Sequence, residues 1–233
     1  MKKKLLVLCT TDSMIWNFLI PHIKEWELKY DVECACSNTG FYFNELKEIY
    51  NLNVIEIPFS RNPIKIKNIK SFFNLSKLTK LKKYDLIICQ EPVGGLMGRL
   101  VAINKGIKVI YTAHGFHFYK GAAIKNWLLY YPIERILAHF TDVLITSNQE
   151  DFELAQKFKA KKIKKINGVG INLEKFNNES SVEIKIKLKK ELNIPLNSKV
   201  ILNAAELIER KNHKIALETF AQLPENSRYF VIC

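Results

Sequence analysis

The segment with the clearest chemical potential runs from Ile107 to Lys120 and joins an apolar run to two histidines. Residues 107–112 are almost all aliphatic, β-branched or aromatic, which predicts a parallel strand buried on both faces. The chain then becomes small and polar, and His114 is the first side chain after the strand that can exchange a proton. Ligands of open α/β sheets bind beyond the carboxyl ends of the strands, so we expect His114 to face a binding crevice. A structural hydrogen bond is the plainer alternative for a lone histidine.

A second candidate for that crevice is Glu91, which follows the strand expected at 85–90. Gly94 and Gly95 come directly after it, at the start of a helix expected over 96–105. Glycines there would let a ligand approach the backbone at a helix amino-terminus. A tight turn that needs small residues is the commoner explanation.

Basic residues dominate the segment between Glu56 and Asp85, which has eight lysines and arginines and no acid. Aliphatic and aromatic residues alternate with them, a pattern typical of a basic amphipathic helix. Its apolar side would pack on the sheet or enter a bilayer surface, where each lysine near anionic lipid contributes about 1 kcal/mol. An ordinary helix with a solvated lysine face fits the pattern equally well.

The composition restricts the protein class. The formal net charge is +13, which favours anionic partners such as nucleic acid, anionic lipid or phosphorylated substrates. No apolar run approaches the roughly 18 residues that a membrane span needs. Five cysteines, an odd number without metal-ligand spacing, indicate reduced thiols in a cytosolic protein.

The order of the predicted elements indicates an α/β fold. Apolar runs predict strands at 3–9, 32–37, 53–58, 85–90, 107–112 and 142–146, and helical patterns lie between them. This alternation predicts a parallel sheet with helices on both faces. A charged helix at 179–197 and a short strand, helix and strand follow to residue 233.

Four segments resemble glycosyltransferase family 4, and most closely its bacterial members that build capsule, teichuronic acid and exopolysaccharide. They are TAHGFHFYKG at 112–121, KNWLLYYPIER at 125–135, TDVLITSNQEDFELA at 141–155 and NGVGINLEKF at 167–176, where Phe176 matches a family position. The resemblance implies the GT-B architecture of two Rossmann-like domains. Residues 1–178 would form the first domain, 179–197 a linker helix, and 198–233 the incomplete start of the second, donor-binding domain.

The resemblance also implies an activity. A hexose or acetamido-hexose would move from a nucleotide-sugar, UDP-linked by expectation, to a lipid-linked or glycan acceptor with retention of configuration, without a metal or other cofactor. His114 would contact the transferred sugar near its 6-hydroxyl, and Lys211 would hold the donor diphosphate and counter its charge in the transition state. Glu134 and Arg135 match a pair common in the family, for which a surface ion pair is the plain interpretation.

The remaining implied site residues fall into three groups. On the donor side we expect Gly115, Glu206 and Arg210 beside Lys211; on the acceptor side Asp12, Ser13, Glu91 and His117; and on the membrane surface Lys65, Lys67, Lys70, Lys77 and Lys80. The enzyme would then lie in the cytoplasm, on the inner face of the cytoplasmic membrane. Because the chain carries one βαβ piece of the donor domain, we expect that these 233 residues alone do not transfer sugar.

Two other functions remain open. The first is a non-catalytic basic module that binds anionic membrane or nucleic acid, although no nucleic-acid recognition motif is present and nucleic acid is not expected. The second is a truncated pseudoenzyme that binds only the acceptor. Affinity that falls steeply with salt and needs no lipid would indicate nucleic acid.

Overall fold

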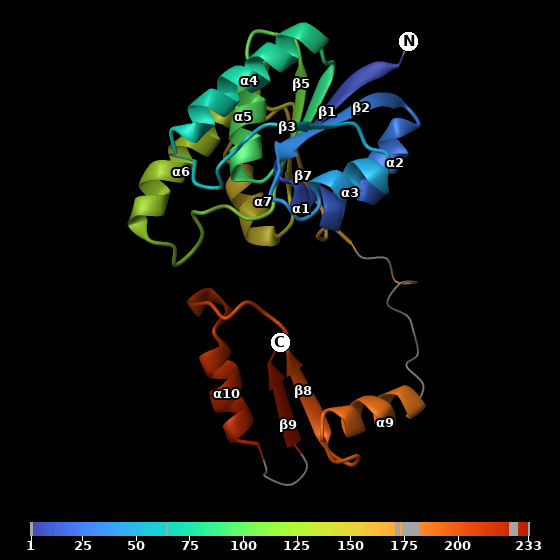
Figure 1. Ribbon diagram of the computed structural model, residues 1–233. Coiled ribbons are helices and arrows are strands. Elements are labelled where there is room, and N and C mark those ends of the chain that lie inside the picture. Colours follow the sequence, from blue (N-terminus) through green and yellow to red (C-terminus); the bar gives the residue numbers. More distant parts are fainter. Residues whose placement is uncertain (1, 64, 171–172, 174–181, 224–227, 233) are drawn as a thin grey trace. The chain divides into compact units, whose positions relative to one another are not determined.

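A computed structural model describes residues 2–63, 65–170, 173, 182–223 and 228–232, without the side chains of 210 and 228–232 (Figure 1). The chain divides into two compact units, Met1–Gly170 and Ile171–Cys233, and each is described by itself. The domain limits expected from the sequence, 1–178, 179–197 and 198–233, stay predictions. Phe176 lies outside the described residues.

The first unit contains a parallel seven-stranded sheet, which confirms the predicted α/β class. Its strand order is β3-β2-β1-β4-β5-β6-β7. The strands are β1 (Lys3–Thr11), β2 (Tyr30–Ser37), β3 (Val54–Glu56), β4 (Leu86–Gln90), β5 (Lys108–Ala113), β6 (Val143–Thr146) and β7 (Lys162–Lys165). Strands β2 and β3 follow one another on one side of β1, and β4 to β7 follow one another on its other side. The order therefore reverses between β1 and β4, which is where open α/β sheets bind their ligands.

Helices cover both faces of this sheet, as the sequence predicted. They are α1 (Asp12–Met14), the π-helical η1 (Ile15–Leu19), α2 (Ile20–Glu27), α3 (Phe43–Glu48), α4 (Lys67–Lys82), α5 (Pro92–Ala102), α6 (Ile124–Leu137), the 3-10 turn η2 (Ala138–Phe140) and α7 (Gln149–Ala155). Figure 1 shows α4, α5 and α6 on one side of the sheet and α2 and α3 on the other. Successive residues of β1 divide between two cores, with Leu6 in one and Val7 in the other, because strand side chains alternate.

The glycines of α5 serve the packing of this helix on the sheet, a role that neither sequence interpretation proposed. A Cβ atom at Gly95 would lie 2.2 Å from the Tyr111 ring, and one at Gly98 would lie 2.9 Å from Cβ of Cys89. Gly94 also has no spare room, since its Cβ would lie 3.2 Å from the Leu8 carbonyl oxygen. Small residues on this face let α5 lie directly against the strands.

Helix α4 confirms only part of the prediction of an apolar buried side. Leu75 is buried in the core, with the partly buried Phe72 and Leu78 packed against it, but the polar Asn68, Ser71 and Thr79 are buried as well, and Ile69 and Phe73 are exposed. The reason is the segment just before the helix: Asn68 accepts a hydrogen bond from the Ser60 amide (2.8 Å) and donates one to the Asn62 carbonyl (2.8 Å). Ser71 donates to the Pro58 carbonyl at 2.8 Å. Buried polar side chains thus satisfy the backbone of residues 58–63.

The second unit has the predicted βαβ piece. Its elements are α9 (Val182–Glu191), β8 (Lys199–Asn203), η3 (Glu209–Lys211), α10 (His213–Ala221) and β9 (Arg228–Ile232). Strands β8 and β9 pair in parallel, from Lys199 opposite Arg228 to Asn203 opposite Ile232. Neither α9 nor α10 has a buried residue among those described.

Candidate functional site

The candidate site lies at the carboxyl ends of three neighbouring strands, β1, β4 and β5. The residues there are Thr10 near the end of β1, Gln90 and Glu91 at the end of β4, and His114 just after β5. Because the strands are adjacent and parallel, side chains far apart in the sequence meet at this one edge. The expectation that His114 and Glu91 occupy the same edge is confirmed by the strand order.

His114 is half-buried and oriented by one hydrogen bond. Its Nε2 lies 2.9 Å from Oε1 of Gln90. An amide oxygen only accepts, so Nε2 carries the proton and Nδ1 is left as the acceptor nitrogen. Burial lowers the pKa of His114 below its ordinary value. The ring is therefore neutral near neutral pH and can accept a hydrogen bond from a hydroxyl group.

The loop that follows His114 is held by the start of α7, the helix that comes after the neighbouring strand β6. Asn148 caps α7 and accepts a hydrogen bond from the Asp151 amide at 2.8 Å. Asp151 in turn accepts a hydrogen bond from the Phe116 amide at 3.2 Å. The Phe116 ring is buried and stacks on Phe118, with ring centroids 4.8 Å apart. The backbone around His114 is thus held by packing and by hydrogen bonds.

Glu91 carries backbone strain at the same edge. Its φ of 62° and ψ of 163° fall in a region that is essentially restricted to glycine and costs about 1–3 kcal/mol. Its Oε2 accepts a hydrogen bond from the Thr10 amide at 3.0 Å, which links the ends of β1 and β4. Burial raises the pKa of Glu91, against the effect of this hydrogen bond and of the Arg61 charge. Strain of this kind is concentrated at functional sites.

A cavity of about 180 Å³ opens beside Glu91. We call it the polar pocket; it is lined by Thr10, Arg61, Pro63, Glu91, Pro92, Val93, His117 and Tyr130. It brings together Glu91 and His117, two residues that we predicted on the acceptor side. His117 is exposed and packs against the Tyr130 ring, with centroids 4.6 Å apart. Arg61, which the sequence indicated only as one basic residue among many, also lines it.

Asp12 has a structural role, and we correct its assignment to the acceptor side. Its side chain is fully buried. Oδ1 accepts hydrogen bonds from the Thr39 hydroxyl at 2.6 Å and the Ser13 amide at 2.7 Å, and Oδ2 accepts one from the Thr39 amide at 3.0 Å. Asp12 therefore joins the loops after β1 and β2. Ser13 is half-buried and its hydroxyl lies 2.9 Å from that of Thr11; its acceptor contact stays a prediction.

The donor-side residues stay predictions. Gly115 is exposed next to His114. Lys211 is exposed in η3, and the carbonyl of Glu206 lies 2.8 Å from Nε2 of His213, the first residue of α10. The side chain of Arg210 lies outside the described residues.

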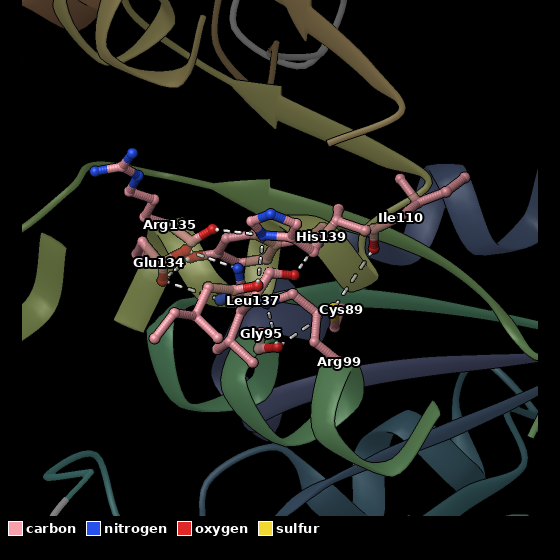
Figure 2. Close-up of polar contacts among 11 residues, drawn as sticks. Cys89, Gly95, Arg99, Ile110, Glu134, Arg135, Leu137 and His139 are labelled. Carbon is pink, nitrogen blue, oxygen red and sulfur yellow. Dashed lines mark hydrogen bonds and ion pairs between the residues drawn. The ribbon is translucent and has the colours of Figure 1, made fainter. Parts of the chain in front are cut away.

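A buried ion pair beneath the site was missed by the sequence reading. Figure 2 shows Arg99 of α5 facing Glu134 of α6, with Nη1 to Oε2 at 2.7 Å and Nη2 to Oε1 at 2.9 Å. Arg99 is fully buried, donates to the Gly95 carbonyl at 2.8 Å and lies 4.0 Å from the centre of the Tyr111 ring. The expected surface pairing of Glu134 is therefore wrong. The pair fixes α6, which carries Tyr130, against α5.

The five lysines predicted for a membrane surface are all exposed, and exposed Ile66, Ile69 and Phe73 lie among them. Within the described residues, every helix is too short or too polar to cross a bilayer. Across the same residues, no three His, Cys, Asp or Glu side chains gather as metal ligands would.

Comparisons with known proteins identify relatives of this chain. The chain is 36% identical over 231 residues to "Putative glycosyltransferase EpsD" of Bacillus subtilis (strain 168), and the matched region covers 97% of this chain and 59% of that protein. It is 29% identical over 216 residues to "UDP-Gal:alpha-D-GlcNAc-diphosphoundecaprenol alpha-1,3-galactosyltransferase" of Escherichia coli, covering 88% of this chain and 54% of that one. The chain thus spans less than two thirds of either relative.

Solved structures show the same fold at low identity. Anabaena Alr3699/HepE in complex with UDP and glucose has a TM-score of 0.73 and 16% identity, over 99% of this chain and 60% of its own. The UDP-GlcNAc 2-epimerase of Neisseria meningitidis, bound to UDP-GlcNAc, has a TM-score of 0.64 and 16% identity, over 99% and 65%. A family model described as "Glycosyl transferase 4-like" matches residues 4–149, and the chain therefore belongs to that family.

Proposed function

We propose that this chain supplies the acceptor-binding domain and the beginning of the donor-binding domain of a glycosyltransferase that builds a cell-surface polysaccharide. The observation that carries the proposal is His114, a neutral imidazole held by Gln90 at the carboxyl end of β5, one strand away from the point between β1 and β4 where the strand order reverses. Two relatives of this chain are named as glycosyltransferases, which supports sugar transfer as the reaction.

In the proposed reaction, the bond between the donor sugar and its nucleoside diphosphate breaks, and the electron pair leaves with the diphosphate. An acceptor hydroxyl bonds to the same carbon, and its proton passes to the departing diphosphate oxygen, with retention of configuration. Nδ1 of His114 accepts a hydrogen bond from a hydroxyl of the transferred sugar and so orients it. Lys211, or Arg210 beside it in the sequence, would hold the diphosphate as its negative charge grows, and Glu206 is a further donor-side candidate. We propose no metal or other cofactor.

The proposed donor is UDP-linked and the proposed acceptor lipid-linked. The HepE structures contain UDP or UDP-glucose, and the name of the E. coli relative specifies UDP-galactose and a diphosphoundecaprenol acceptor. A lipid-linked acceptor would place the enzyme on the inner face of the cytoplasmic membrane. The exposed Lys65, Lys67, Lys70, Lys77 and Lys80 support contact with anionic lipid. Nucleic acid is not a proposed partner.

A transfer assay tests the proposal. The complete gene product, including any in-frame sequence after codon 233, is incubated with bacterial membranes and radiolabelled UDP-sugars. We expect label in the lipid fraction, and a loss of about 10²-fold when His114→Gln removes the oriented imidazole. His22→Gln, which changes an exposed histidine of α2, is the matched control and should transfer normally. Absence of transfer from every nucleotide-sugar, or an unaffected His114→Gln variant, would contradict the proposal.

A further inference from the structure

A second cavity adjoins the polar pocket and differs from it in chemistry. This apolar pocket of about 150 Å³ is lined by Pro63, Pro92, Leu96, Leu129, Tyr130, Ile133 and Glu134. Its only ionisable group besides the Tyr130 hydroxyl is Glu134, and both oxygens of that carboxylate already accept hydrogen bonds from Arg99. The cavity therefore offers aliphatic and ring carbon to a ligand and little hydrogen bonding.

The two pockets share part of their walls. Pro63, Pro92 and Tyr130 line both of them. A molecule that occupies both pockets therefore has one end among Arg61, Glu91 and His117 and the other end among aliphatic groups. Only an amphiphile satisfies both environments, since a sugar would lose its hydrogen bonds in the apolar pocket.

Arg61 sets the charge of the polar end. It is exposed, and across the described part of the chain it takes part in no ion pair. Glu91, the carboxylate that lines the same pocket, is influenced by the Arg61 charge, but its Oε2 accepts a hydrogen bond from the Thr10 amide. An arginine that keeps its donors available suits a phosphate group, which it binds with two parallel hydrogen bonds.

Both walls of the pocket pair are held in place before any ligand binds. Asn68 fixes residues 60–62 through its hydrogen bonds to Ser60 and Asn62, and so fixes the loop that carries Arg61. The Arg99 and Glu134 pair fixes α6, which contributes Leu129 and Ile133. Preorganised walls lower the cost of ordering a bound ligand.

The apolar surface continues outward along α6. Leu129, Ile133 and Ile136 follow one another at helical spacing, and 39%, 36% and 60% of these residues remain exposed. Exposed aliphatic side chains that extend from a cavity mark a surface that a ligand covers. An aliphatic chain longer than the cavity would lie along this stripe.

We propose that the paired pockets bind a lipid phosphate, with the phosphate at Arg61 and the first carbons of its aliphatic chain between Leu96, Leu129 and Ile133. This inference rests on the proposed function, to which it adds the seat of the lipid acceptor. A free phosphate would use the polar pocket alone, and a neutral lipid the apolar pocket alone. Neither would need both.

The test uses the 233-residue chain and farnesyl phosphate below its micelle concentration, measured by isothermal titration calorimetry. We expect saturable binding to one site, at least about tenfold tighter than that of farnesol or inorganic phosphate, because each lacks one half of the contacts. Binding of farnesol as tight as that of farnesyl phosphate would overturn the proposed phosphate site, and equal binding of inorganic phosphate would overturn the chain site.

Matched variants locate the ligand. Arg61→Gln and Ile133→Ser should each weaken binding by about tenfold. The controls Lys29→Gln, just after α2, and Leu81→Ser, in α4, change exposed residues outside both pockets and should bind like the wild type. Thermal unfolding checks that each variant is folded. Wild-type affinity in both pocket variants would refute the location.

The transfer assay separates this inference from the proposed function. Sugar transfer to a water-soluble acceptor without farnesyl phosphate binding would leave the proposed function standing and refute the lipid site. Farnesyl phosphate binding without transfer from any nucleotide-sugar would leave the lipid site standing and refute the proposed function.

Discussion

Replacing Glu134 with leucine would leave the Arg99 guanidinium buried without a counter-charge. Arg99 is fully buried, so water cannot take the place of the lost carboxylate. The variant loses two charge-assisted hydrogen bonds, of 2.7 and 2.9 Å, and keeps only the Gly95 carbonyl and the Tyr111 ring as partners. Breaking a buried pair in this way costs about 3–5 kcal/mol in the free energy of unfolding. That is a large part of the 5–15 kcal/mol by which a typical domain is stable.

The double variant Arg99→Met with Glu134→Leu separates the cost of an orphaned charge from the value of the pair. It removes both charges and fills the same space with apolar atoms, so we expect its stability to lie within about 1–2 kcal/mol of the wild type. The two single variants should each be much less stable than this. Their effects are therefore strongly non-additive.

Urea unfolding followed by circular dichroism measures these differences. Glu27→Leu is the control, because the Lys24 and Glu27 pair is exposed and such pairs contribute about 0–1 kcal/mol. If Glu134→Leu proved as mild as the control, or if the double variant lost the sum of the single losses, the reasoning about the buried pair would be refuted.

Two further predictions concern the packing and the electrostatics of the first unit. Gly95→Ala places a Cβ atom 2.2 Å from the Tyr111 ring and should lower the free energy of unfolding by about 1–3 kcal/mol; unchanged stability would contradict the close approach of α5. Burial acts to raise the pKa of Glu33, but hydrogen bonds from Lys82 and Tyr84 outweigh it and the pKa is lowered. The stability that the ionised Glu33 contributes should be fully present above the unfolded pKa of about 4.3 and be lost as the pH falls through the lower folded pKa. A difference in the free energy of unfolding between the wild type and Glu33→Gln that stays the same at every pH would refute this.

Much of the sheet could be predicted because its central strands are apolar. Strands β4 and β5 correspond to short runs of mostly apolar residues in the sequence, and such runs predict buried parallel strands. Strand β7 has the sequence KIKK and was missed, because its side chains give no run of apolar residues. It lies at the edge of the sheet, where lysines are typical.

The site was predictable where it depends on chain order and not where it depends on long-range contacts. His114 and Glu91 follow adjacent strands, so their shared edge could be inferred from the strand pattern alone. The partner of Arg99 lies 35 residues away, and no local pattern indicates it. Asp12 was assigned wrongly because a carboxylate after a strand serves equally well to hold a neighbouring loop. A hydropathy pattern likewise cannot indicate that polar residues of α4, among them Asn68 near its start, are buried.

The most direct test of the proposed function is the pH dependence of sugar transfer by the complete gene product. Because burial lowers the pKa of His114, its neutral, accepting form should predominate at neutral pH and be lost as the pH falls below the ordinary histidine value of about 6.5. We predict that the rate falls with this loss, and that this acid limb is absent in a much slower His114→Gln variant. A His114→Gln variant that transfers sugar like the wild type at every pH would contradict the account.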